Sequence, residues 1–178
     1  NVGTLNVKAK AVNKNYEDAT VEYTLKVTRK AVTVTANDKT KVFGEKDPEW
    51  TATVDGTLGD DTVKYTLSRK AGEDVGKYTI TPSGKAEQGN YSVTYATGTL
   101  TITKAETMTL TPELTGKNAE KVYDSKPLSG GAKATVTEGT TITYSTDGGK
   151  TWSETLPSIT NVGTLNVKAK AVNKNYED

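Results

Sequence analysis

The sequence of 178 residues contains no cysteine and no histidine, and only one methionine and one phenylalanine. Without cysteine there is no disulfide framework, and without both residue types the common zinc sites and nucleophile–histidine pairs are excluded. No apolar run is long enough to cross a membrane and no signal peptide is present, although neither absence is informative for a fragment. We expect no catalytic residue, no cofactor and no metal ligand, and a protein that is not an enzyme.

Positive and negative charges are nearly balanced, with 23 lysines and arginines and 22 aspartates and glutamates. A nucleic-acid-binding protein would gather its basic residues on one face, whereas the lysines here are scattered among threonines and acidic residues. We therefore expect no nucleic-acid partner and no membrane insertion of this segment. The hydrophobic share of 33% suits small β modules better than one large core.

What the sequence does contain is an exact repeat, because Asn1–Asp18 recurs without change as Asn161–Asp178. Two identical copies 160 residues apart predict a tandem array, of which this chain is a segment that begins and ends inside a module. Such an array favours a polymer of small domains over a self-contained enzyme.

Apolar and polar residues alternate with a period of two along most of the chain, and helical signals are nearly missing. Tyr23, Leu25 and Val27, for example, would share one face of a strand. The same pattern occurs at 5–11, 31–36, 77–81, 91–95 and 99–103. We predict an all-β fold of tandem small β modules in an extended arrangement, each an Ig-like sandwich or, as the second choice, a β-grasp-like sheet.

A fainter repeat divides the 160-residue unit into two related modules, A and B. The matched segments are Asp74-Val75-Gly76 with Asn1-Val2-Gly3, Asn90-Tyr91 with Asn15-Tyr16, the closing strands Leu100–Lys104 and Leu25–Lys30, and Val42-Phe43 with Val122-Tyr123. The predicted domains are the C-terminal fragment of module A at 1–30, a complete module B at 31–104, and module A without its closing strand at 105–178.

The strand that module A lacks at 105–178 is the one found at 19–28. A sheet without one of its strands exposes unpaired backbone groups and an apolar groove. We expect Ala19–Thr28 to fill the open module of a neighbouring molecule, in a head-to-tail assembly that does not close. The alternative is that the N-terminal segment packs beside module B as an extra hairpin.

Module B contains a series of short motifs: Val42-Phe43-Gly44 before Asp47-Pro48, then Gly59-Asp60, Leu67-Ser68-Arg69, Ala71 to Gly76, Tyr78 and Asn90-Tyr91. Through these motifs module B resembles the MBG-type repeat of bacterial cell-surface proteins. The sequence departs from the family pattern at two positions. Phe43 stands where the family often has tyrosine, and Trp50 stands where a smaller apolar residue is expected. The resemblance implies a repeat region of a large secreted, wall-anchored protein of a Gram-positive bacterium, often an adhesin. Module A is similar to the Ig-like repeats that accompany such domains.

The segment 145–152, Ser-Thr-Asp-Gly-Gly-Lys-Thr-Trp, fits the Asp-box of sialidases and related propellers. Its physical basis is a hairpin turn in which an aspartate accepts backbone N–H bonds and a glycine takes a positive φ. We expect Ser145, Asp147, Gly149 and Trp152 to form a structural turn. A sialidase would also need an arginine cluster, and the chain has only Arg29 and Arg69.

Three other kinds of chemistry stay open as minor alternatives. A pair of carboxylates for glycoside hydrolysis could come from Asp60, Asp61, Glu73 and Asp74. A calcium site could form near Asp60 and Asp61. A lysine–asparagine or lysine–aspartate crosslink would suit a stalk without cysteine, but no feature singles out the pair.

Aromatic residues are the remaining candidates for recognition. Tyr78, Tyr91 and Tyr123 lie on alternating patterns and are expected in the core. Trp50 follows a loop signal and is the candidate for an exposed, sugar-contacting aromatic.

Two functions remain. We expect a structural stalk on the bacterial cell surface that projects an adhesive head. The alternative is a set of weak binding modules for host glycans or mucin that act by multivalency.

Overall fold

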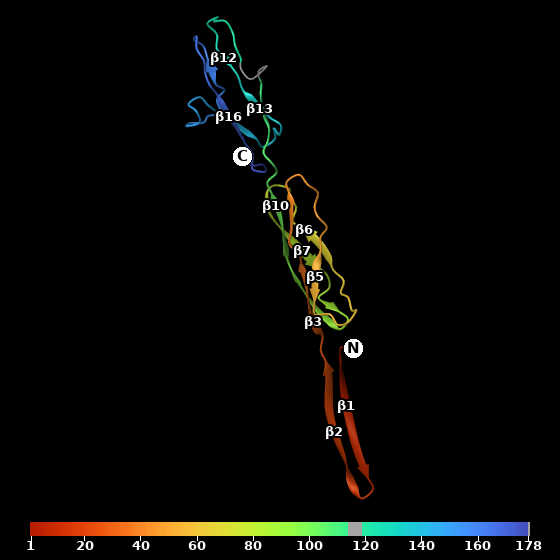
Figure 1. The fold of residues 1–178 in the computed structure, drawn as a ribbon. Coiled ribbons are helices and arrows are strands. Elements are labelled where there is room, and N and C mark those ends of the chain that lie inside the picture. The colour runs from red at the N-terminus through yellow and green to blue at the C-terminus, as the bar shows by residue number, and fades with distance from the viewer. Residues whose placement is uncertain (114–118, 178) are drawn as a thin grey trace. The chain divides into compact units, whose positions relative to one another are not determined.

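The structure, a computed structural model, describes residues 1–113 and 119–177. Contacts divide the chain into two compact units, the first made of Asn1–Lys39, Pro48–Ala71 and Lys77–Thr101 and the second of Thr40–Asp47, Gly72–Gly76 and Ile102–Asp178. Every regular element of the described part is a β-strand (Figure 1), so the predicted all-β fold is confirmed. With no helix in that part, there is none that could span a bilayer.

The predicted domain limits, after residues 30 and 104, stay predictions. The predicted module at 105–178 also includes residues 114–118 and 178, which lie outside the described residues.

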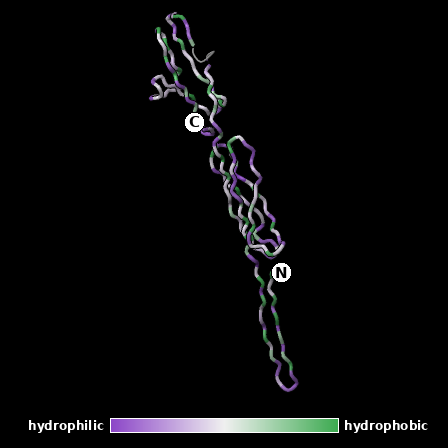
Figure 2. Tube along the Cα trace, viewed as in Figure 1, coloured by the Kyte–Doolittle hydropathy of each residue, from purple (hydrophilic) through white to green (hydrophobic). Residues whose placement is uncertain are grey.

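Residues 3–27 form a two-stranded antiparallel hairpin of β1 (Gly3–Asn13) and β2 (Tyr16–Val27) (Figure 1). Its register places odd-numbered residues opposite odd-numbered ones, as in the pairs Leu5–Leu25 and Ala9–Val21. Side chains alternate across a strand, so these residues share one apolar face while lysines, threonines and a glutamate occupy the other. Hydrophobic and hydrophilic residues accordingly alternate along this segment in Figure 2.

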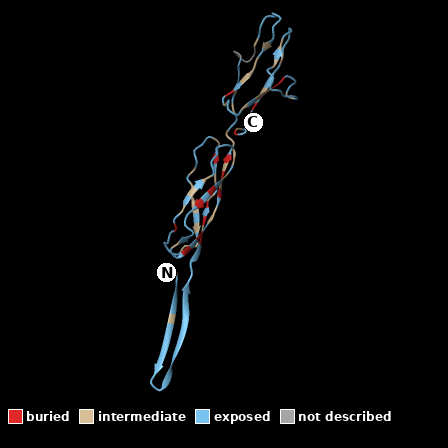
Figure 3. Cartoon of the chain, turned by 180° about the vertical axis from the view of Figure 1, so that it is seen from behind, coloured by how far each residue is buried: buried red, intermediate tan, exposed pale blue. Residues whose placement is uncertain are grey.

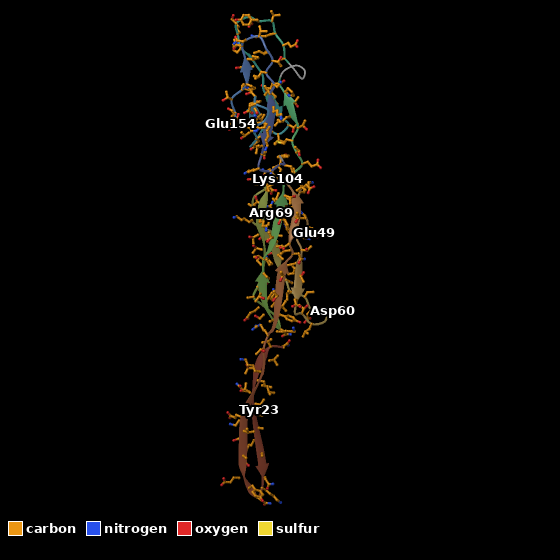
Figure 4. The ribbon with its side chains drawn as sticks, turned by 60° about the vertical axis from the view of Figure 1, so that its left-hand side comes forward. Tyr23, Glu49, Asp60, Arg69, Lys104 and Glu154 are labelled. Atoms are coloured by element: carbon orange, nitrogen blue, oxygen red, sulfur yellow. The ribbon has the colours of Figure 1, made fainter. Side chains whose placement is uncertain are left out.

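Both faces of the hairpin are open to solvent. Every residue of β2 is exposed, and in β1 only Val7 is partly covered (Figure 3). Tyr23, labelled in Figure 4, is 49% exposed although it belongs to the apolar face. The alternative to strand exchange predicted that the N-terminal segment forms an extra hairpin. The segment does form a hairpin, but neither of its strands is buried. An isolated two-stranded hairpin is marginally stable in water.

Two four-stranded sheets follow. The strands of the first, in spatial order, are β5 (Ala52–Asp55), β3 (Lys30–Ala36), β9 (Tyr91–Ala96) and β8 (Glu87–Gln88). The strands of the second are β4 (Lys39–Val42), β10 (Gly98–Thr103), β7 (Gly76–Ser83) and β6 (Thr66–Arg69). Within the first sheet β3 and β9 run parallel, whereas β3–β5 and β8–β9 are antiparallel. In the second sheet β6 and β7 are antiparallel.

The core of the molecule is built by these two sheets. Val34, Ile80 and Leu100 are fully buried, and they come from β3, β7 and β10 respectively. The other buried apolar residues of the region are Val32, Ala36, Val63, Tyr91, Val93 and Ile102. Alternation of buried and exposed residues along β3, β9 and β10 is the pattern expected when one face of each sheet is covered.

The segment from Ile102 onward contains three small antiparallel sheets. Their strands are β11 (Leu110–Pro112) with β13 (Ala132–Ala134), β12 (Leu128–Ser129) with β15 (Ser158–Ile159), and β14 (Thr141–Ser145) with β16 (Lys168–Val172). Its buried apolar residues are few: among the described residues from 105 to 177, only Ala134, Tyr144 and Ala171 qualify. Two of these are alanines, so this core is thin.

Candidate functional site

Two asparagines hold turns that the sequence repeat predicts to be equivalent. In the first unit, the side-chain oxygen of Asn90 accepts a hydrogen bond from the backbone N–H of Val2 at 3.1 Å. The backbone oxygen of Asn90 accepts another from the N–H of Lys30 at 2.9 Å. We call this arrangement the Asn90 clamp, because one residue ties the start of β1 and the start of β3 together.

The second unit contains a corresponding Asn175 clamp. The side-chain oxygen of Asn175 accepts a bond from the N–H of Val75 at 2.8 Å, and its backbone oxygen accepts one from Ala105 at 2.9 Å. The amide of Asn175 also donates to Asp74 at 2.9 Å, and Lys174 forms an ion pair with the same carboxylate at 2.7 Å. Asn175 is only 7% exposed, so its own hydrogen bonds are partly shielded from water, whereas the Lys174–Asp74 ion pair lies on the exposed side of the clamp.

The two clamps share one plan. In each, the N–H of a valine that precedes glycine donates to the side chain of the asparagine in an Asn-Tyr pair. In each, a backbone N–H near the start of the following segment donates to that asparagine's carbonyl oxygen. Sequence comparison alone matched the Val-Gly and Asn-Tyr segments, but it gave no signal that the two would be in contact.

The turn that carries Asn175 is fixed by a second asparagine. Asn173 accepts the N–H of Asn175 at 3.0 Å and donates its amide to the Glu138 carbonyl and the Thr140 hydroxyl, both at 2.9 Å. Tyr176 then meets Phe43 edge to face, with ring centroids 5.5 Å apart. Edge-to-face pairs of this kind add to the energy of simple burial.

Charge also contributes to the Asn175 clamp. The hydrogen bond from Lys174, followed by that from Asn175, lowers the pKa of Asp74 from its ordinary value. Stabilisation of the charged carboxylate by donors explains this direction. Asp74, one of the carboxylates considered for glycoside hydrolysis, is therefore occupied by structural contacts.

A buried lysine lies in the same unit. Lys41 is 5% exposed, and its ammonium contacts Asp47 at 2.8 Å, Glu73 at 2.5 Å and the Glu45 carbonyl at 3.1 Å. Hydrogen bonds to Asp47 and then to Glu73 raise the pKa of Lys41. A lysine–aspartate crosslink would require the neutral amine as nucleophile, whereas this environment favours the ammonium ion. The lysine is buried but its ion pairs are only partly so, because the side chains of Asp47 and Glu73 are 32% and 62% exposed.

The segment 145–152 forms a tightly bonded turn. Asp147 accepts the N–H groups of Lys150 and Thr151 at 2.9 and 3.0 Å, together with the hydroxyls of Ser145 and Thr151 at 2.7 and 2.6 Å. These donors, Thr151 foremost, lower the pKa of Asp147. At Gly149 φ is +100°, a conformation that favours glycine. The geometry is that of a structural turn.

The aromatic candidates lie at different depths. Trp152, on the turn just described, is 42% exposed and donates from Nε1 to the Gly149 carbonyl at 3.2 Å. Trp50 is of intermediate burial, as is Tyr78, and Tyr91 is in the core. The prediction that Tyr123 is in the core is wrong, since it is 58% exposed. Its segment, 119–127, belongs to no strand and so has no sheet face to bury it.

The two acidic residues considered for calcium differ in their surroundings. Asp61 accepts the phenolic hydrogen bond of Tyr91 at 2.5 Å, which raises the pKa of that tyrosine. Asp60 lies on the exposed surface (Figure 4). Among the described residues, no three acidic side chains come together in a way that could hold a metal ion.

Comparison with known proteins gives one match. Residues 32–101 match the MBG domain (YGX type), and so the central two-sheet region is similar to an MBG repeat. The match covers 70 of the 178 residues, 32 through 101. No curated protein and no solved structure matches the chain.

Proposed function

We propose that the chain is part of a structural stalk, a repeat region of a large secreted and cell-wall-anchored protein of a Gram-positive bacterium. In this proposal the tandem modules project an adhesive head from the cell surface, and their partners are neighbouring repeats of the same protein. The similarity of residues 32–101 to an MBG domain supports a repeat-type surface module.

The observation that carries the proposal is the recurrence of one clamp. Val2 with Asn90 and Val75 with Asn175 make the same hydrogen bond, at 3.1 and 2.8 Å. In a linear array each module contacts only its neighbours, so length can grow by duplication if one kind of junction is repeated. A unique binding site, by contrast, would gain nothing from an exact copy of eighteen residues.

Small-angle scattering on proteins with one, two and three 160-residue repeats tests the stalk. We expect the maximum dimension to increase by a constant increment for each repeat. Replacement of Asn175 by alanine in every repeat should broaden the distribution of dimensions, because the clamp is lost. Replacement of this asparagine in the first copy alone, Asn15, which is exposed in the structure, is the matched control. A compact particle whose dimension grows with the cube root of mass would rule out a stalk.

The alternative is that each repeat binds host glycans weakly and that the array acts by multivalency. The observation in its favour is the exposed indole of Trp152, since sugars stack on aromatic faces and 42% of this residue is open to solvent. Glycan arrays probed with a three-repeat protein test this function. Binding should be lost in Trp152→Ala and retained in Trp152→Phe, and an absence of binding across host mucins would favour the stalk.

A further inference from the structure

The sequence Asn-Lys-Asn-Tyr occurs twice, at 13–16 and at 173–176, and it folds into the same turn in both places. We call the two copies the first turn and the second turn. In each, the backbone N–H of the third residue donates to the side chain of the first, at 2.9 Å in the first turn and 3.0 Å in the second. The first turn lies at the tip of the hairpin (Figure 1), and all four of its residues are exposed. It therefore takes this shape without being packed, and a segment that is already ordered loses little entropy when it binds.

The second turn is seated against two loops, at 42–47 and 72–76, that belong to the same compact unit. Val75 donates its N–H to the second asparagine of the turn at 2.8 Å. Asp74 accepts bonds from the amide of that asparagine at 2.9 Å and from the lysine of the turn at 2.7 Å. Phe43 meets the tyrosine of the turn edge to face, with ring centroids 5.5 Å apart. We call Phe43, Asp74 and Val75 the socket.

One buried lysine holds both halves of the socket. The ammonium of Lys41, which is 5% exposed, contacts Asp47 at 2.8 Å and Glu73 at 2.5 Å. The first carboxylate belongs to the loop that carries Phe43, and the second directly precedes Asp74. These contacts do not involve the turn, so we expect the socket to keep its shape when the turn leaves.

The first turn presents to solvent the same three groups that the second turn uses. Lys14, Asn15 and Tyr16 are all exposed, the tyrosine by 76%. Because the two turns agree in sequence and in internal hydrogen bonding, the contacts made by one can be made by the other. We propose that the first turn binds the socket of a second copy of this chain, through the same hydrogen bonds, ion pair and ring contact.

The corresponding turn of module B does not fit the socket. It reads Gly89-Asn90-Tyr91, with glycine where the first and second turns have lysine, so it offers no cation to Asp74. Its tyrosine is 6% exposed and belongs to the core. The residue before the valine that Asn90 binds is Asn1, whose side chain is neutral. Charge therefore distinguishes the two clamps, with lysine facing aspartate in one and glycine facing asparagine in the other.

The second turn competes with the first for the socket of each molecule. It is covalently attached, which gives it a high effective concentration. Asn173 also donates to the Glu138 carbonyl and the Thr140 hydroxyl, both at 2.9 Å. The first turn binds only the fraction of sockets from which the second turn has departed, and its apparent affinity falls by that fraction. Binding between copies is thus weak in the unmodified chain and strong once the second turn is disabled.

This contact rests on the clamp from which the stalk is proposed, and it identifies the partner as another copy of the repeat. Because the two turns are identical, either one satisfies the socket. One molecule can therefore be joined to a neighbour without any new kind of interface.

Hydrogen exchange at Val75 tests the proposal, since this N–H is the one that the turn covers. The receiver is a full-length chain, labelled with nitrogen-15, in which both turns are disabled by Asn15→Ala, Tyr16→Ala, Asn175→Ala and Tyr176→Ala. When unlabelled, unmodified chain is added, we expect protection of the receiver's Val75 amide to increase at least about tenfold at saturation. An unlabelled chain that carries only Asn15→Ala and Tyr16→Ala is the matched control and should give no increase. The same result with both unlabelled chains would overturn the proposal.

Photo-crosslinking gives a second measurement that leaves the socket and the second turn intact, and so does not depend on the folding of the receiver. Tyr16 is replaced by p-benzoylphenylalanine, and chains with two isotopic labels are mixed, irradiated and digested. We expect capture of 42–47 and 72–76 of the other copy, at least about fivefold above capture by the same analogue at Tyr23, because crosslinking follows the bound fraction. Tyr23 is the control because it is also exposed on the hairpin, by 49%. Equal capture from the two positions would overturn the proposal.

Failure of this contact can be distinguished from failure of the stalk. A maximum dimension that grows by a constant increment per repeat, without protection at Val75, would retain the stalk and overturn the contact. Protection at Val75 together with a compact multi-repeat particle would support the contact and rule out the stalk.

Discussion

The two copies of the eighteen-residue repeat have the same sequence and different structures. In the first, residues 3–13 are one strand that pairs with β2 along its length, apart from a register shift between Ala11 and Asn13. In the second, only Lys168–Val172 is a strand, and its partner, β14, is unrelated to β2. Local sequence therefore sets where a strand can form, and the neighbouring strand decides how much of it does form.

The copies also agree at one point. Asn13 accepts the N–H of Asn15 at 2.9 Å, and Asn173 accepts that of Asn175 at 3.0 Å. A side chain that bonds the backbone two residues ahead is a local preference of asparagine. What differs is the surroundings, because the first turn is exposed and the second is buried against Glu138 and Asp74. Each substitution in one copy thus has a matched control in the other.

The largest effect is expected when the second copy, residues 163–173, is given the partner strand of the first copy, which is β2. A chain extended beyond Asp178 by a copy of residues 19–30 should pair that segment with 163–173. The amides of 163–167 should then gain protection from hydrogen exchange by a factor on the order of a hundred, which is about 2.7 kcal/mol of opening free energy. The same extension with its leucine replaced by aspartate is the control. Unchanged protection in the first extended chain would contradict the comparison.

The buried turn should be more sensitive to mutation than the exposed one. Asn173→Ala removes two donated bonds and one accepted bond and leaves the Glu138 carbonyl without its donor. We expect it to lower the free energy of unfolding of the second unit by about 2–3 kcal/mol. Asn13→Ala, in the exposed copy, should cost about 0.5 kcal/mol or less. Urea unfolding followed by hydrogen exchange in β14 measures the difference, and equal losses in the two copies would contradict it.

Much of the fold could be predicted because its strands carry a local signal. Alternation at 5–11, 31–36 and 99–103 places β1, β3 and β10 correctly. Alternation carries no information about partners, however. The parallel pairing of β3 with β9, whose residues lie about sixty positions apart, depends on contacts across the sheet. For the same reason, the sequence could not predict that its two identical copies would pair with different strands.

The clamps were harder to predict than the strands. Asn173 and Asn175 are 5% and 7% exposed, and an asparagine in a turn gives no sign that it will be buried. Lys41 presents the same difficulty, because its burial depends on two carboxylates that come from different loops. A signal was present only in the internal repeat, which placed an Asn-Tyr pair at corresponding positions of both modules.

A smaller difference is expected between the two tyrosines of the repeat. Tyr176 packs edge to face on Phe43, whereas Tyr16 is 76% exposed. Tyr176→Ala should cost the second unit about 1–2 kcal/mol, and Tyr16→Ala about 0.5 kcal/mol or less. A double-mutant cycle with Phe43→Ala measures the coupling, which should be about 0.5–1.5 kcal/mol. A coupling near zero would show that the rings contribute only their separate burial.

The smallest effect concerns charge and depends on pH. Lys174 pairs with Asp74, whereas its copy Lys14 lies in the exposed turn between β1 and β2. Because the pKa of Asp74 is lowered in the folded state, its contribution to stability is present above the carboxylate's ordinary value of 3.8 and is lost as the pH falls below it. Lys174→Ala should therefore lower the melting temperature of the second unit slightly at pH 7, and the difference should vanish toward pH 2. Both side chains are more than half exposed, so the effect should also shrink in 1 M salt. Lys14→Ala should change nothing at either pH, and a Lys174→Ala effect that persisted at pH 2 would show that the lysine acts through packing and not through its charge.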